Sequence, residues 1–205
     1  MHRISCPRPL DRMAPQRGIV LLLALIFLLL LTLLASGAVG QALLQERMAG
    51  AQRNAQQAAF AAEAALRGAQ WRLWSGAAAG ALHCGEAPVA DCHIDDPAHP
   101  NASIEAFRHA SGWITEGATE YRGSNGSRDF TMLPGSGLDA EARRTAVLAR
   151  NPVYVIEDLG PANSGTTAGT GRRIYRITAR ATGGRPNVVQ VRESVFAAGG
   201  EGGGD

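Results

Sequence analysis

The chain has 205 residues, 45% of them hydrophobic and 5% aromatic, and its net charge at neutral pH is +2. All twenty basic residues are arginine, and four of them lie in residues 1–18 with a single acid, which leaves sixteen arginines against seventeen acids in the rest of the chain. This balance excludes an electrostatic nucleic-acid binder, and the length suits one modest domain beside a membrane segment.

The first predicted element is a membrane segment. No charged side chain occurs between Arg17 and Glu46. Carried as a helix at about 1.5 Å per residue, this stretch covers the roughly 30 Å hydrocarbon core of a bilayer. The four arginines ahead of it favour a cytoplasmic N-terminus. The sequence therefore predicts a bacterial inner-membrane protein that crosses once and exposes its C-terminal part to the periplasm.

Three outcomes are open for this segment. It is a permanent anchor, a secretory signal removed near Ser36-Gly37-Ala38, or a prepilin-type segment whose leader is cut after Gly18 so that Ile19 becomes the first residue. The apolar run is long for a signal peptide, whose apolar core has about 7–15 residues. A glycine directly before the run gives the scissile bond the freedom to be extended, as a prepilin cut requires.

The cysteines agree with export. Cys6 lies in the leader, which leaves Cys84 and Cys92 as an even pair. We expect a disulfide, which is typical of an oxidising periplasm. A zinc site with neighbouring histidines is the alternative, but the spacing matches no standard zinc module. The residues concerned are His83, His93 and His99.

No cofactor, metal site or enzymatic activity is expected. The sequence contains no nucleophile elbow, phosphate loop or Cys-x-x-Cys motif. A group of acids lacks the glycine-punctuated loop of an EF-hand, so a solvated turn is favoured over a calcium site. These acids are Asp91, Asp95 and Asp96.

A long helix is predicted from Ile19 to Trp74, because no proline occurs between Pro15 and Pro88. Small and apolar residues recur every three or four positions on one side, which we name the alanine stripe: Leu44, Met48, Ala51, Ala55, Ala59, Ala62, Leu66, Ala69 and Leu73. Such a stripe lets another backbone approach closely, so it is expected to continue the assembly contact begun by the membrane segment. A bulkier aromatic set is expected to face a globular head: Phe60, Ala64, Trp71 and Trp74.

The residues after the helix are predicted to form a small globular head. Residues 76–150 are loop-rich, with a core expected from Ile104, Phe107, Trp113 and Ile114. Strands are predicted at 153–157, 173–179 and 188–196, the last two joined by a hairpin turn at 183–187. On the last strand Val189, Val191 and Val195 share one face. The meander is expected to lay one buried face on the upper half of the helix.

The whole plan resembles type IV pilins, and particular strings are similar to PilX-type minor pilins. The similarity rests on Gly18-Ile19 with the leucine-rich run behind it, on 44–50 and 61–67 in the helix, and on 154–157 and 175–184 in the strands. It covers residues 17–75 and 150–196. It implies an α+β, pilin-like fold in which a long N-terminal helix, membrane-embedded in its first half, packs against a small antiparallel sheet.

The resemblance also implies a function. Prepilin peptidase would cut after Gly18, and Ile19 would be N-methylated. The subunit would enter a type IV pilus at low copy and help to initiate assembly with other minor pilins, the major pilin and a large tip protein. Candidate assembly residues along the helix are Leu23, Leu44, Glu46, Arg47, Met48, Ala55 and Glu63.

One position departs from the major pilins. They carry a glutamate at the fifth mature position, where this chain has Leu23. A subunit with nothing ahead of it does not need that glutamate and avoids placing a carboxylate in lipid. This predicts a position at or near the filament tip. A minor pseudopilin of a type II secretion system shares the departure and is one alternative, and a periplasmic binding module released by signal peptidase is another.

The expected organisation follows the chain in order: a leader (1–18), a membrane or filament-core half-helix (19–40), a periplasmic half-helix (41–75), a loop-rich head region with the disulfide (76–150), a β-meander (151–197) and a disordered tail (198–205).

Overall fold

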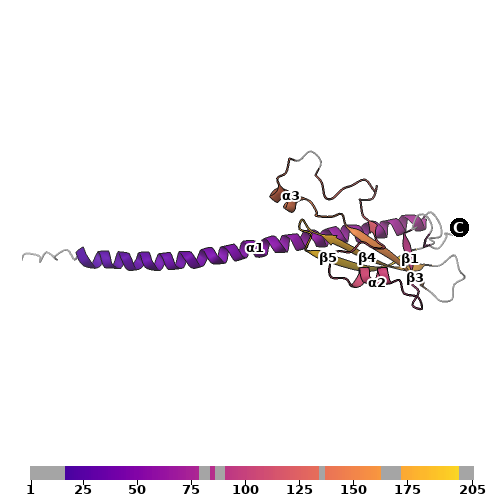
Figure 1. Ribbon diagram of the computed structural model, residues 1–205, viewed down its shortest axis with the longest axis horizontal. Coiled ribbons are helices and arrows are strands. Elements are labelled where there is room, and N and C mark those ends of the chain that lie inside the picture. Colours follow the sequence, from indigo (N-terminus) through magenta and orange to yellow (C-terminus); the bar gives the residue numbers. More distant parts are fainter. Residues whose placement is uncertain (1–16, 79–83, 86–90, 134–136, 163–171, 199–205) are drawn as a thin grey trace, which may run out of the picture. The chain divides into compact units, whose positions relative to one another are not determined.

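The computed structural model describes residues 17–78, 84–85, 91–133, 137–162 and 172–198 (Figure 1). Most of the expected leader, the tail from residue 199 onward and His83 lie outside the described residues, as does most of the loop between the first two predicted strands. The chain divides into two compact units, Met1–Ala49 and Gly50–Asp205.

The first helix, α1, spans Arg17–Ala78, close to the predicted bounds. The absence of proline and the richness in alanine and leucine favour this length, since these residues have high helix propensity. The helix contains a window long and apolar enough to cross a membrane. Its residues 17–49 belong to the first unit, and its residues 50–78 form part of the second.

The second unit is built on a mixed sheet of five strands. The three long strands are β3 (Val153–Pro161), β4 (Arg173–Thr182) and β5 (Val189–Ala198), which pair antiparallel as the sequence predicts. Two short strands border β3 on its other side, β1 (Cys92–Ile94) in parallel and β2 (Thr119–Glu120) antiparallel. The parallel pair was not predicted and makes the sheet mixed rather than purely antiparallel.

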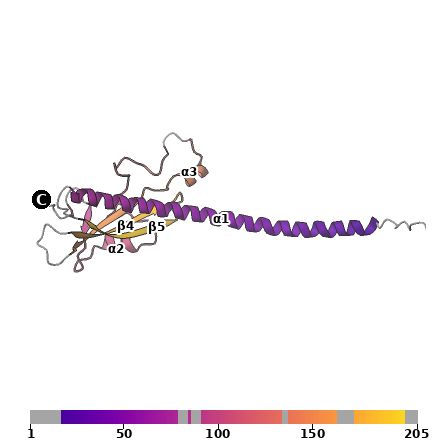
Figure 2. The same cartoon turned by 180° about the vertical axis from the view of Figure 1, so that it is seen from behind.

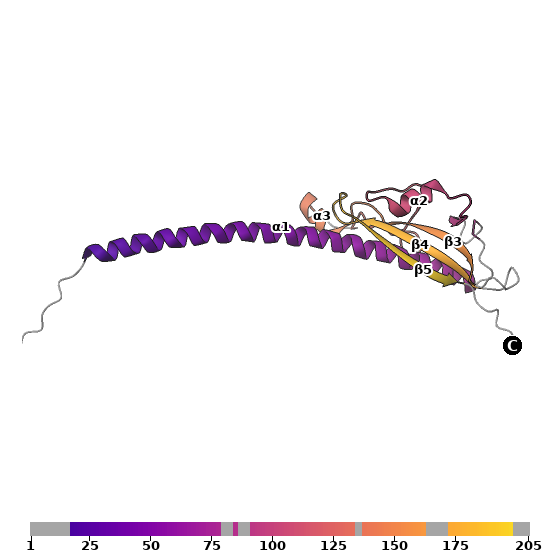
Figure 3. The ribbon, with the colours of Figure 1, turned by 90° about the horizontal axis from the view of Figure 1, so that it is seen from below.

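Each face of the sheet is covered by a helix, and Figure 3 shows the Gly50–Ala78 part of α1 and the short helix α2 on opposite faces. Against α1, the sheet packs large side chains on small ones of the helix, in a cluster that includes Tyr154, Ile156, Tyr175, Ile177, Ala65 and Ala69. On the other face, α2 (Ala102–His109) buries Ile104 and Phe107 against Val153 and Val155, with Trp113 and Ile114 partly buried at the edge. The predicted core of the loop-rich region is thereby confirmed.

The loop region 110–152 returns to α1 through a second short helix, α3 (Ala140–Ala146), which lies beside α1 in both views of Figures 1 and 2. Gln57 of α1 donates a hydrogen bond to the Thr145 carbonyl at 2.6 Å. Asn101 and Asp139 cap the N-termini of α2 and α3 with their side-chain oxygens. The backbone donors at both helix starts are therefore satisfied locally.

On β5 the face that contacts α1 is not the valine face. Ser194 accepts a hydrogen bond from Gln70 of α1, and Phe196 and Ala198 join the cluster beneath the helix. Because side chains alternate along a strand, the valines point to the opposite face, where Val195 is exposed. The helix therefore packs on β5 through Ser194, Phe196 and Ala198.

Candidate assembly surfaces

The face of α1 that holds the head consists mainly of alanine. Seven side chains between residues 58 and 73 are buried on it: Ala58, Ala61, Ala62, Ala65, Leu66, Ala69 and Leu73. Small side chains bring the helix axis close to the sheet, and the sheet supplies most of the bulk. The upper part of the alanine stripe thus packs within the subunit and is not available to a neighbour, whereas its lower members Leu44, Met48 and Ala51 are exposed.

The aromatic set lies on the other side of the helix. Phe60, Trp71 and Trp74 are 74%, 57% and 55% exposed. The prediction that they face the head is wrong, and the reason is geometric. They sit about half a turn away from the buried alanines, and the sheet already fills the space on the alanine side.

Two glycine contacts show how tightly the head approaches α1. A Cβ on Gly68 would lie 2.1 Å from the ring of Tyr121, and a Cβ on Gly183 would lie 2.3 Å from the backbone oxygen of Asn54. Arg185 in the β4–β5 turn donates its backbone N–H to Asn54 Oδ1 at 2.9 Å. Asn54 and these two glycines were not singled out from the sequence, where only the turn signal at 183–187 pointed to this region.

The apolar segment of the first unit is exposed along its whole length. Every large hydrophobic side chain from Ile19 to Leu34, Leu23 among them, is 48–71% exposed. Gly18 and Ile19 lie in the first turn of α1, so the structure has helix where the proposed cut needs an extended bond. A stretch this apolar is stable in lipid or against other apolar helices.

The candidate residues beyond this segment fall into two groups. Leu44, Glu46, Arg47 and Met48 are exposed, whereas Ala55 is half-buried at the edge of the head. Glu63 forms an ion pair with Arg67, one helical turn later, in which Arg67 Nη2 lies 2.8 Å from Glu63 Oε1. The structure thus brings the first four together on an accessible stretch of helix.

The predicted disulfide is present between Cys84 and Cys92, whose Cα atoms are 5.0 Å apart. It ties the segment after α1 to β1. Both sulfur atoms are consumed by the bond, so neither is available as a zinc ligand. His93 contacts the carbonyl of Gly117 and His99 contacts Asp96, and the described residues contain no cluster suited to a metal ion.

A polar network anchors the end of α1 to the head. Arg72 donates to Asp91 at 2.7 Å and to the hydroxyl of Tyr154 at 3.0 Å, and Thr119 also donates to Asp91. Burial alone would raise the pKa of Asp91, but these hydrogen bonds and the charge of Arg72 outweigh burial and hold its pKa below the usual value. Asp91 therefore joins the end of α1 to the segment before β1 through its contacts with Arg72 and Thr119.

A second polar group holds α2 on the sheet. Arg180 is fully buried, and its guanidinium donates to the backbone carbonyls of Phe107, Ala110 and Gly112 near the C-terminus of α2. The partial negative charge of a helix C-terminus suits this cation. Nearby, burial raises the pKa of Glu157 even though Arg108 and Arg176 lie 3.8 and 3.5 Å away.

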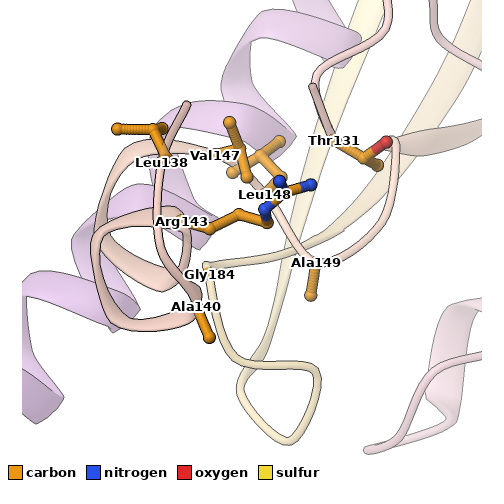
Figure 4. A pocket seen from close by; sticks show the side chains of 8 residues that line it. All are labelled: Thr131, Leu138, Ala140, Arg143, Val147, Leu148, Ala149 and Gly184. Carbon is orange, nitrogen blue, oxygen red and sulfur yellow. The ribbon is translucent and has the colours of Figure 1, made fainter. Parts of the chain in front are cut away.

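A pocket lies between α3 and the β4–β5 turn (Figure 4). It has a volume of about 460 Å³ and is open to solvent. Its lining is mostly apolar, with Arg143 extending from α3 toward Leu148: Thr131, Leu138, Ala140, Arg143, Val147, Leu148, Ala149 and Gly184. Among the residues that line the pocket, Arg143 carries the charge.

An exposed apolar N-terminal helix that continues into a small α+β head is the architecture of a type IV pilin. The chain matches the PilX N-terminal family over residues 17–67 and the C-terminal family of the type IV pilus assembly protein PilX over residues 50–198. It belongs to the PilX family of type IV pilus minor pilins, a structural family. No curated protein and no solved structure matches the chain.

Proposed function

We propose that this protein is a low-copy minor pilin that helps to initiate type IV pilus assembly and occupies a position at or near the tip. It would be held in the inner membrane by residues 19–40 with its head in the periplasm. Prepilin peptidase would then release the leader after Gly18, and Ile19 would be N-methylated. Its partners would be other minor pilins, the major pilin and a large tip protein.

The observation that carries the proposal is the state of α1. The helix exposes all its large apolar residues from Ile19 to Leu34, and it also exposes Leu44 and Met48 beyond them. A helix with this much apolar surface needs lipid first and neighbouring helices afterwards. An assembling pilus subunit meets both surroundings.

The position at the tip rests on Leu23. This apolar residue stands where major pilins carry glutamate, and it offers no carboxylate to a charged N-terminus ahead of it in the filament. Gold labelling of an epitope-tagged subunit on purified pili tests this part separately. Label at filament ends is expected, whereas even label along the shaft would contradict it.

A released periplasmic module is less compatible with the structure. Such a protein would need the helix from Leu44 onward to be packed inside its head. Leu44 and Met48 are instead 61% and 64% exposed, and Phe60 and Trp71 are also open to solvent. A pseudopilin of a type II secretion system would show the same exposure, so the choice between pilus and secretion system is decided by the fraction in which the protein is found.

The decisive experiment measures the N-terminal residue and the destination of the protein in its native host. Intact mass and peptide mapping should find a methylated Ile19 start, and the protein should appear in sheared pili. A start near Val39, an intact Met1, or absence from the pili of a piliated strain would each refute the proposal.

Met48→Arg should prevent incorporation, because it places a charge on the exposed helix face, while the melting temperature of the head stays unchanged. Gln52→Ala on the exposed helix is the matched control.

A further inference from the structure

The last strand of the sheet, β5, has one edge without a partner strand. The strand order is β1-β3-β4-β5, with β2 also beside β3, so β4 lies on one side of β5 and no other strand among the described residues lies on its other side. All residues from Val189 to Ala198 pair with β4 without a register shift. The free edge is therefore as long as the strand, roughly 34 Å at about 3.4 Å per residue.

Hydrogen bonds elsewhere in the sheet show which residues of β5 direct their backbone groups to that edge. The Asp95 N–H donates to the Asp158 carbonyl at 3.0 Å, so the even-numbered residues of β3 point toward β1. Because successive residues of a strand bond to opposite sides, odd residues of β3 bond to even residues of β4, and odd residues of β4 bond to even residues of β5. The N–H and C=O groups on the free edge therefore belong to the odd-numbered residues of β5: Val189, Val191, Glu193, Val195 and Ala197.

The edge lacks most of the features that prevent a strand from pairing. Edge strands are usually protected by proline, by a bulge, by several charges or by a covering segment. The strand β5 has no proline and no bulge, Arg192 and Glu193 are its charged residues, and Val195 is 63% exposed. A row of backbone donors and acceptors that repeats about every 6.8 Å is matched along its length by an extended backbone, whereas a helix bonds its own backbone groups internally. The geometry of the edge therefore specifies a strand as the occupant.

The side chains beside the edge add a preference for charge. Glu193 already lies 3.8 Å from Arg108. Arg192 instead donates to the Gln190 side chain at 3.4 Å and to the Val191 carbonyl at 3.1 Å, and neither acceptor is charged. An exposed guanidinium with neutral acceptors is complemented by a carboxylate on the adjacent strand, because opposite charges on neighbouring strands attract.

We infer that the free edge of β5 binds an extended segment of a different exported protein, which adds to the sheet as a further strand and places a carboxylate beside Arg192. The inference goes beyond the proposed function and holds whether the protein enters a pilus or a secretion system. A second copy of this chain is disfavoured. Two β5 edges that pair antiparallel are related by a two-fold axis perpendicular to the sheet, which runs their Gly50–Ala78 helices in opposite directions. Copies anchored in one membrane enter it in the same sense, so this pairing does not suit them.

Photo-crosslinking in the native host tests the inference. A photo-activatable phenylalanine analogue replaces Val191, or separately Val195, in the full-length protein. Mass spectrometry should find crosslinks to one segment of another exported protein, and the two sites should lie about four residues apart because both chains are extended. A helix in the same place would give sites about nine residues apart, since it rises only about 1.5 Å per residue. The same analogue at Glu105, exposed on α2, is the control.

A matched pair of substitutions separates a backbone contact from a side-chain contact. Val195→Pro removes an N–H on the free edge and none that bonds to β4, so the head should keep its fold. Crosslinking from Val191 should then fall about ten-fold, because one ladder hydrogen bond is lost and the proline ring obstructs the added strand. Val195→Thr keeps the N–H and the β-branched shape, and its yield should equal that of the wild type. Arg192→Glu should lower the yield about three-fold, as expected for an exposed ion pair.

Several results would overturn the inference. These are crosslinks to lipid, to a second copy or to a helix, the absence of any crosslink, and equal yields from Val195→Pro and Val195→Thr. If Val195→Pro lowers the melting temperature of the head, the spacing of the crosslinks formed without it decides between strand and helix. Absence of the wild-type protein from pili would refute the proposed function alone, since the crosslinks do not require a pilus.

Discussion

The close approach of the β4–β5 turn to α1 predicts that Gly183→Ala destabilises the head. The new Cβ would lie 2.3 Å from both the backbone oxygen and Oδ1 of Asn54. Non-bonded carbon and oxygen atoms require about 3.3 Å, so the turn would have to move by about 1 Å. The backbone oxygen cannot swing aside as a flexible side chain would, because it belongs to the helix.

The magnitude follows from two contributions. Overpacking against a rigid neighbour costs about 1–3 kcal/mol. The displaced turn would also weaken the 2.9 Å hydrogen bond from Arg185 to Asn54, which contributes about 1 kcal/mol. The expected loss is therefore about 2–4 kcal/mol, equivalent to a fall in melting temperature of roughly 5–15 °C for a head of this size.

The assay is thermal and urea unfolding of the full-length protein in detergent, followed by near-ultraviolet circular dichroism. Gly112→Ala is the control, because a Cβ there meets nothing within 4 Å, and it should change the stability by less than about 0.5 kcal/mol. If Gly183→Ala is as stable as this control, the turn does not lie against the helix as described.

Three further changes probe other parts of the head. Replacing Cys84 and Cys92 by serine opens a loop with a sequence separation of 8 and should cost about 2.5 kcal/mol in urea unfolding; an unchanged midpoint would show that the bond constrains nothing. Because the pKa of Asp91 is held low in the fold, its contribution is present above the ordinary value of 3.8 and is lost as the pH falls through the lowered value. The stability difference between wild type and Asp91→Asn should therefore shrink below pH 3.8, and a constant difference would contradict the ion pair. Leu73→Ala, at a fully buried position, should cost about 2–5 kcal/mol, whereas Trp71→Ala should leave the unfolding midpoint nearly unchanged; equal effects would mean that the two helix faces have been misassigned.

Much of the fold was predictable from local patterns. The absence of proline between Pro15 and Pro88 permits the length of α1, and β-branched runs start β3 and β4 at the predicted residues Val153 and Arg173. The even cysteine pair predicted the disulfide. In these places the local preference and the final structure agree, so short-range rules were sufficient.

The orientation of α1 was not predictable from residue size. Bulky aromatics are expected to face the head, but the sheet contributes Tyr154, Ile156, Tyr175 and Ile177 to the contact, and the helix contributes mainly alanine with two leucines. The parallel pairing of β1 was also missed, because a strand of three residues carries too little pattern. The burial of Arg180 was not predictable from the sequence, because an arginine on a strand is expected to be exposed, and its burial depends on α2 covering that face of the sheet.

The candidate surface was predictable only in part. The apolar segment from Ile19 to Leu34 is evident from hydropathy, and its link to pilus assembly came from resemblance to a family. The exposure of Phe60, Trp71 and Trp74 follows from helical periodicity, because these positions lie about half a turn away from the buried alanines.

The two faces of the upper part of α1 differ in how freely their residues can be substituted. Any enlargement of Ala58, Ala62, Ala65 or Ala69 would force the helix away from the sheet, so this side has little freedom to change. On the opposite side Phe60, Trp71 and Trp74 are each more than half exposed, so substitutions there are less constrained by the packing of the head. After gene duplication, substitutions on the exposed side of the helix would therefore change the contacts with neighbouring subunits while the core of the head stays the same.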